Sequence, residues 1–153
     1  MTSGGGGDFF CSSVDIVQGT LVSGDHTSAH VSDDVYLITQ SVLAAQNKHW
    51  IEEVFTFSTG LSGLSSLDYT IEGHHDNDNA ITFDVYAWKY STSDWVKVDT
   101  FDIPTGTSDT IHSESIPDPA DYISGGEVKL RFIAKKGQTW QFSHDFLKIT
   151  AQP

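Results

Sequence analysis

The chain has 153 residues and a formal net charge of −13, from 21 acidic and eight basic residues. This charge excludes nucleic acid as a partner, because phosphate backbones are bound through clustered Lys and Arg. No run of about 18 apolar residues occurs, so we expect no membrane insertion. The single cysteine, Cys11, excludes an internal disulfide and a cysteine-based zinc site.

The first expected element is a glycine-rich N-terminal arm over residues 1–14, which precedes a single domain over residues 15–153. Four consecutive glycines make the arm flexible, and an apolar aromatic pair follows them. We expect this arm to contact a neighbouring subunit. The residues expected at that contact are Gly4, Gly5, Gly6, Gly7, Phe9 and Phe10.

Nine segments with the features of β-strands follow, at the spacing of about 8–12 residues that is typical of a sandwich or barrel. Alternation is clearest where Leu67, Tyr69 and Ile71 share one face. Sixteen of the 21 acidic residues are Asp, which favours turns over helices. Only residues 44–49 and 117–122 suit a helical turn. The expected strands are 15–21, 35–42, 50–58, 67–72, 81–90, 94–103, 107–116, 127–134 and 140–150.

The sequence therefore predicts an all-β fold, an antiparallel sandwich of about eight to nine strands. Within it, residues 85–90 and 94–98 form a hairpin through a short polar loop. This hairpin and residues 119–132 resemble the jelly-roll β-sandwich modules of extracellular proteins, carbohydrate-active enzymes and virion proteins. Residues 18–20, 32–36 and 67–73 are similar to the same modules. The resemblance covers about residues 15–150, and it implies a jelly roll without marking an active site.

Calcium is the metal that this resemblance implies. In galactose-binding-like jelly rolls an acidic residue of the last strand often helps to hold a structural calcium, and Asp145 occupies a similar place. The early-strand Glu that usually partners it is not evident here.

A second calcium candidate comes from the residues themselves, in the polar segment 74–79. Oxygen ligands two residues apart suit Ca²⁺, which makes Asp76 and Asp78 candidates. The segment is not an EF-hand, because it lacks the glycine and the glutamate of that loop. The alternative is an ordinary polar hairpin loop. Zinc bound by His74 and His75 is less favoured, because a third ligand at set spacing is missing.

Aromatic residues gather on the predicted hairpin. Tyr86, Trp88 and Tyr90 alternate along one strand face, and Trp95 reaches the same face from the partner strand. Such rings could bind sugars, because the CH groups of a pyranose pack well on aromatic planes. The alternative is that they are cross-strand pairs that stabilise the hairpin by about 0.2–1 kcal/mol each.

The sequence carries no arrangement typical of an enzyme. The nearest approach to a nucleophile elbow, residues 60–63, lacks the required spacing. The adjacent carboxylates Glu52 and Glu53 point to opposite faces of a strand, so they cannot act as a catalytic pair. A polysaccharide-degrading enzyme is therefore the weakest of three hypotheses, and we expect no catalytic activity.

The favoured hypothesis is a non-enzymatic structural protein that decorates a virus or phage capsid and docks through its arm. Its partners would be other subunits of the assembly, a homo-oligomer is expected, and the location would be the virion surface. The alternative is a carbohydrate-binding module of a secreted or surface protein. Its partners would be glycans, its binding residues would be the aromatic set, and its location would be extracellular.

Overall fold

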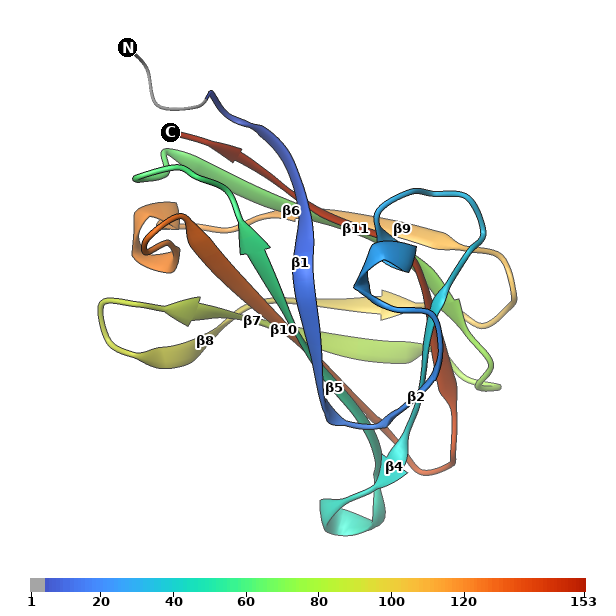
Figure 1. The fold of residues 1–153 in the computed structure, drawn as a ribbon. Helices are drawn as coiled ribbons and strands as arrows, with labels where there is room; N and C mark the ends of the chain where they lie inside the picture. The colour runs from blue at the N-terminus through green and yellow to red at the C-terminus, as the bar shows by residue number, and fades with distance from the viewer. Residues whose placement is uncertain (1–4) are drawn as a thin grey trace.

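β-Strands dominate the computed structural model, which describes residues 5–153 and holds eleven strands and three short 3₁₀ helices within that range (Figure 1). The strands are β1 (Gly7–Gln18), β2 (Thr20–Ser23), β3 (Leu37–Gln40), β4 (Val42–Leu43), β5 (His49–Ser58), β6 (Ser66–His75), β7 (Ile81–Lys89), β8 (Asp94–Ile103), β9 (Thr110–Ser115), β10 (Glu127–Lys136) and β11 (Gln141–Gln152). The 3₁₀ helices span His26–Ala29, Ala45–Asn47 and Pro119–Tyr122. Among these helices none has the length and apolar character to cross a membrane.

The strands form two antiparallel layers that face each other. In sheet A, β11 pairs with β6 on one side, and β6 pairs with β9. On its other side β11 pairs with β3, which continues to β2, and with the first residues of β1. Sheet B runs from β1 through β5, β10 and β7 to β8, with β4 also paired to β5. The jelly-roll sandwich predicted from the sequence is confirmed.

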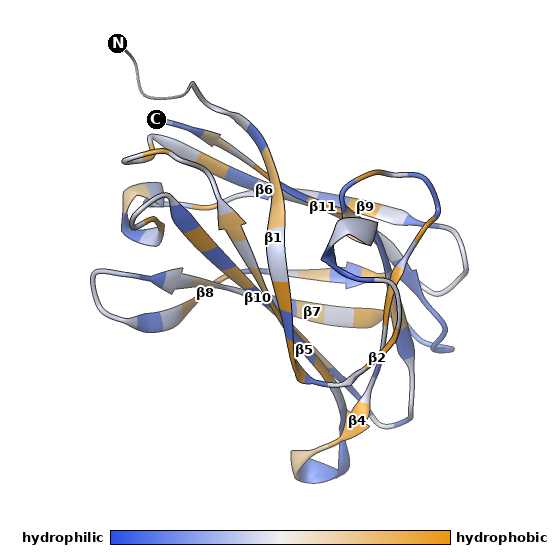
Figure 2. Ribbon diagram, viewed as in Figure 1, coloured by the Kyte–Doolittle hydropathy of each residue, from blue (hydrophilic) through white to orange (hydrophobic). Residues whose placement is uncertain are grey.

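Each of the nine expected segments contains strand residues, and the segment 94–103 matches β8 at both ends. The expected strand 15–21 is instead divided at Gly19, where φ is 128°, into the end of β1 and the start of β2, which pair with different strands. Both expected helical turns are present as well, with Pro119 at the first helical position, where its missing N–H costs nothing. Figure 2 shows the alternation of apolar and polar residues along the strands that carried the prediction. The period of two buries one face of each strand against the opposite sheet.

The structure moves the domain boundary toward the N-terminus. Residues Gly7 to Phe10 pair with β11, and the rest of β1 pairs with β5, so this strand joins the two sheets. Phe9 packs against the core, and Phe10 lies edge-on to Phe146 with ring centroids 5.7 Å apart. Much of the segment predicted as an arm is therefore a strand.

The remaining arm residues lie before this strand. Gly5 and Gly6 precede β1 and are exposed, and Gly4 lies outside the described residues. A contact between this segment and another subunit stays a prediction.

The core lies between the sheets and is rich in aromatic side chains. Phe83 of sheet B meets Phe142 of sheet A with ring centroids 4.8 Å apart, and Tyr69 meets Phe132 at 5.8 Å. Burial of each large apolar side chain contributes about 1.5–3 kcal/mol, so these contacts supply much of the force that holds the layers together.

A polar cluster interrupts this apolar core. Glu53 of β5 and His144 of β11 are both fully buried, and Glu53 Oε1 lies 2.7 Å from His144 Nε2. The Thr39 hydroxyl donates to the other carboxylate oxygen at 2.7 Å. Glu52 points the opposite way, to the outer face of sheet B, where it pairs with Arg131. The expectation that Glu52 and Glu53 cannot act together is therefore confirmed.

Candidate functional site

The outer face of sheet B carries the aromatic residues singled out from the sequence. Val85 and Ala87 of β7 are buried, so Tyr86 and Trp88 project from the opposite side and stay partly exposed. Trp95 lies directly opposite Trp88 in the hairpin, and their rings meet edge to face with centroids 5.3 Å apart. We call Tyr86, Trp88 and Trp95 the aromatic face.

An arginine lies beside this face. The register of β10 and β7 sets Arg131 opposite Tyr86. Its guanidinium carbon lies 5.4 Å from the centre of the Tyr86 ring and 5.6 Å from that of Trp95. Arg131 Nε lies 2.8 Å from Glu52 Oε2, so the carboxylate holds the cation in place over the rings. The sequence analysis missed Arg131, because only the strand register shows that it faces Tyr86.

Tyr90 lies just beyond the end of β7, in the hairpin turn. Its hydroxyl donates to Glu127 Oε1 at 2.9 Å, and burial together with this carboxylate raises the pKa of Tyr90 above its usual range. Tyr90 therefore remains a hydrogen-bond donor at neutral pH. The aromatic face and its neighbours thus combine flat apolar rings with charged groups that can donate to, or accept from, hydroxyl groups.

A second candidate is a cluster of three carboxylates, which come from the β-bulge in β11 and from the segments that precede β3 and β9. One oxygen from each of Asp34, Asp109 and Asp145 lies within 4.8 Å of the other two. Asp145 Oδ1 accepts hydrogen bonds from the backbone N–H groups of Asp33 and Asp34, at 3.2 and 2.9 Å. The Tyr36 hydroxyl lies 3.0 Å from Asp34 Oδ1 and 3.1 Å from Asp109 Oδ2.

The charges in this cluster are only partly compensated. Burial raises the pKa of Asp145, and the nearby charges of Asp109 and Glu72 raise it further, against the opposing effect of the two backbone N–H donors. A hard cation suits such oxygen ligands and would relieve the repulsion between them, so the donor set fits Ca²⁺. Asp34 and Asp109 were missed from the sequence, because no spacing rule links positions so far apart.

The other predicted metal ligands do not join this cluster. Within residues 5–153, Asp76 and Asp78 belong to no group of three close ligands, and Asp76 Oδ1 accepts from the Gln141 N–H at 2.7 Å. His74 and His75 lie on opposite faces of β6. His74 Nδ1 lies 2.8 Å from Asp109 Oδ1, whereas His75 donates from Nε2 to the Ile103 carbonyl at 2.9 Å. The two histidines therefore cannot share a zinc ion.

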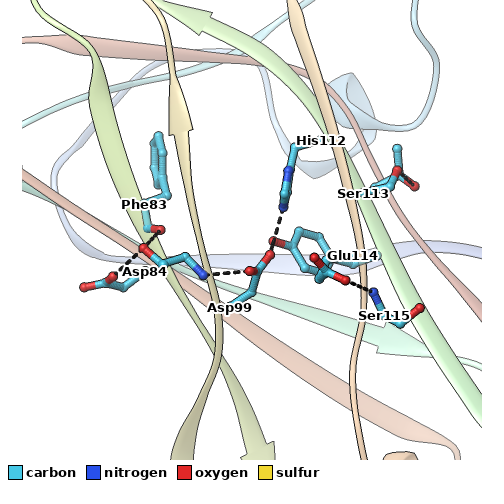
Figure 3. Close-up of polar contacts among 10 residues, drawn as sticks. Phe83, Asp84, Asp99, His112, Ser113, Glu114 and Ser115 are labelled. Carbon is cyan, nitrogen blue, oxygen red and sulfur yellow. Dashed lines mark hydrogen bonds and ion pairs between the residues drawn. The ribbon is translucent and has the colours of Figure 1, made fainter.

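A third polar cluster bridges the two sheets where β8 and β9 are edge strands (Figure 3). Asp99 Oδ2 accepts from the Tyr69 hydroxyl at 2.6 Å and lies 2.8 Å from His112 Nε2. Burial raises the pKa of Asp99, but the hydrogen bonds from Tyr69 and His112 outweigh it, so the net shift is downward. Asp99, Tyr69 and His112 are hydrogen-bond partners of one another, and we interpret the cluster as structural.

Carbohydrate-binding modules recur among the solved structures that are similar in fold to this chain, which confirms the resemblance noted in the sequence. No protein-family model matches the sequence, and no curated protein matches it.

Three of these structures illustrate the similarity. The Clostridium thermocellum endo-1,4-β-D-xylanase 10B, with CBM22-1 and GH10 modules and bound xylohexaose, gives a TM-score of 0.60 at 14% identity. The enzymatically active domain of the bacteriophage CBA120 tailspike protein 4 gives 0.56 at 14%. The carbohydrate-binding module CBM36 in complex with calcium and xylotriose gives 0.52 at 13%.

The coverage differs among the three. The alignments include 94%, 92% and 93% of this chain, but 26% of the xylanase chain, 19% of the tailspike chain and 98% of the CBM36 chain. This chain thus spans about a quarter of the first protein and a fifth of the second. At these identities the likeness is one of fold.

Proposed function

We propose that the chain is a non-catalytic carbohydrate-binding module that binds a glycan on the aromatic face. The observation that carries the proposal is the pair Trp88 and Trp95 beside Tyr86, with Arg131 held over two of the rings. Pyranose rings would pack on the partly exposed indoles, and Arg131 and Glu52 would bond sugar hydroxyls. The recurrence of carbohydrate-binding modules among structures of the same fold supports this function and an extracellular location.

Decoration of a capsid has less support. Gly7, Phe9 and Phe10 were expected to contact another subunit, but they pair with β11 in the same chain, and Phe9 packs against the core. A similarity in fold to a tailspike domain at 14% identity does not distinguish a virion protein from a binding module. Glycan binding is therefore the better-supported function.

Trp88→Ala tests the proposal directly. Stacking of a flat ligand on an aromatic side chain contributes about 1–3 kcal/mol, so we expect glycan affinity to fall about 5- to 150-fold. Isothermal titration with oligosaccharides selected on a glycan array measures the loss. Phe10→Ala, on the outer face of sheet A, is the matched control and should retain wild-type affinity. Equal affinity in wild type and Trp88→Ala would contradict the proposed site.

We infer that Ca²⁺ is the cation suited to Asp34, Asp109 and Asp145, and that it would stabilise the fold. The thermal midpoint should be higher in CaCl₂ than in EGTA, by about 2–4 °C for each kcal/mol of binding linkage. Mg²⁺ should do less, because it demands a smaller octahedral site. Asp145→Asn should remove the difference. Identical midpoints in CaCl₂ and EGTA would show that the carboxylates hold no calcium.

A further inference from the structure

The basic residues are unevenly distributed over this acidic protein. Five of the eight form ion pairs with carboxylates: Lys89, Lys97, Lys129, Arg131 and Lys148. The other three, Lys48, Lys135 and Lys136, form no ion pair with any residue of 5–153. We call these three lysines the basic end.

The three lysines meet at one end of sheet B. Lys135 and Lys136 are the last residues of β10, where the register places them opposite Trp50 and His49 of β5. Lys48 immediately precedes His49. Because consecutive strand residues point to opposite faces, Lys135 leaves β10 on the outer side and Lys136 on the other, where it lies near Lys48. The three lysines therefore lie on both sides of the end of β10, on a protein whose net charge is −13.

A groove of about 460 Å³ opens at the basic end, and its volume falls within the range typical of ligand sites. Its lining combines two of the lysines with side-chain amides and a glycine: Lys48, Lys136, Asn77, Asn79, Gln138 and Gly137. Ammonium and amide N–H groups are the donors that bind carboxylate and sulfate oxygens.

The loop geometry favours donation into this groove. Asn77 is largely buried, and its Oδ1 accepts from the Asn79 N–H at 3.0 Å, which leaves its NH₂ group for a ligand. The carboxylates of the same loop are placed elsewhere. Asp76 bonds the Gln141 N–H, and Asp76 and Asp78 both line a neighbouring groove beside Thr105, to which Asn77 also contributes.

Lys135 connects the basic end to the outer face of sheet B. Lys129, Arg131, Ile133 and Lys135 alternate with the inward-facing residues of β10, so they lie in a row on the outer face. At about 3.3 Å per residue, Lys129 and Lys135 are about 20 Å apart. Lys135 Nζ lies 3.9 Å from the centre of the Trp50 ring, so a further aromatic stands where the row meets the groove.

We propose that the glycan bound by this chain is acidic, with a carboxylate or sulfate group bound at the basic end and neutral sugars along β10 toward the aromatic face. This inference rests on the proposed function and adds the class of ligand. The net charge of −13 repels a polyanion over a distance of about 10 Å at 0.1 M salt. A mostly neutral oligosaccharide with an acidic sugar at one end therefore fits the charge distribution better than a polyanion.

A glycan array that prints each oligosaccharide in neutral, uronate-bearing and sulfate-bearing forms tests the inference with the full chain. We expect binding to concentrate on the acid-bearing forms, and the preferred substituent identifies the oxyanion. The double variant Lys48→Gln/Lys136→Gln should weaken binding of those forms about 3- to 10-fold, and added salt should weaken it in the wild type. Lys148→Gln, which removes a lysine from the outer face of sheet A, is the matched control. It should change neither the binding of the acid-bearing forms nor the effect of salt on that binding.

The outcomes separate the two proposals. Equal binding of neutral and acid-bearing forms, with no effect of the lysine double variant, would overturn the acidic ligand and leave glycan binding on the aromatic face intact. Binding to no form of any oligosaccharide would overturn the proposed function, and the acidic ligand with it.

Discussion

Replacing Glu53 by alanine is expected to lower the free energy of unfolding by about 3–5 kcal/mol, because the change leaves the buried His144 Nε2 without the carboxyl group that it contacts. His144 Nδ1 already has no hydrogen-bond partner, and its ring packs between Phe55 and Phe142. The imidazole is fully buried in the folded protein. Urea unfolding followed by tryptophan fluorescence measures the change.

The double variant Glu53→Leu/His144→Phe separates the loss of a partner from the loss of the pair. Apolar side chains that replace a buried ion pair often leave stability unchanged or raise it, so this variant should recover much of the loss. If Glu53→Ala costs less than about 1 kcal/mol, the pair does not hold the sheets together. If the double variant is no more stable than Glu53→Ala, the loss came from packing alone.

Asp99→Asn is expected to lower stability at pH 7 by about 1.5–3 kcal/mol and to reduce its dependence on acid. The carboxylate of Asp99 binds Tyr69 and His112 across the edge of the sandwich, and its pKa in the folded state is lowered. Because its pKa is lower in the folded than in the unfolded state, Asp99 stabilises the fold fully at pH values above its unfolded-state pKa of about 4. This stabilisation is lost as the pH falls through the folded-state pKa. Wild type should therefore lose stability below pH 4 more steeply than Asp99→Asn.

Unfolding curves recorded from pH 7 to pH 2 check this difference. Asp102→Asn is the matched control, since Asp102 lies on the same strand and is exposed, with a single hydrogen bond from Thr82. Its acid dependence should follow the wild type. Parallel stability profiles for wild type and Asp99→Asn would mean that Asp99 is not the group that links the sheets.

The fold was largely predictable, because short strands with period-two alternation and polar turns specify a sandwich locally. The start of β1 was misjudged for a physical reason. The glycines suggested flexibility, while the partly buried Phe9 and the buried Cys11, two residues apart, already had the spacing of a strand. At this position the alternation of apolar residues predicts the structure better than the glycine-rich composition does.

The candidate sites divide by how far apart their residues lie in the sequence. Trp88 and Trp95 could be paired from the sequence, because a short hairpin fixes its own register. Arg131 beside Tyr86, and Asp34 beside Asp109, depend on pairing between distant strands and loops, which no local rule gives. Asp145 was predicted as a metal ligand from the resemblance to jelly-roll modules, but that resemblance did not identify Asp34 and Asp109 as its partners.

The pairing of Gly7 with Ala151 brings the first and last strands side by side at one edge of sheet A. A host protein could therefore carry this domain inside one of its own surface loops, because the two junctions would leave the sandwich close together. For the same reason, a permuted chain that joins these ends and opens at the exposed Ser91–Ser93 turn should keep every strand pair.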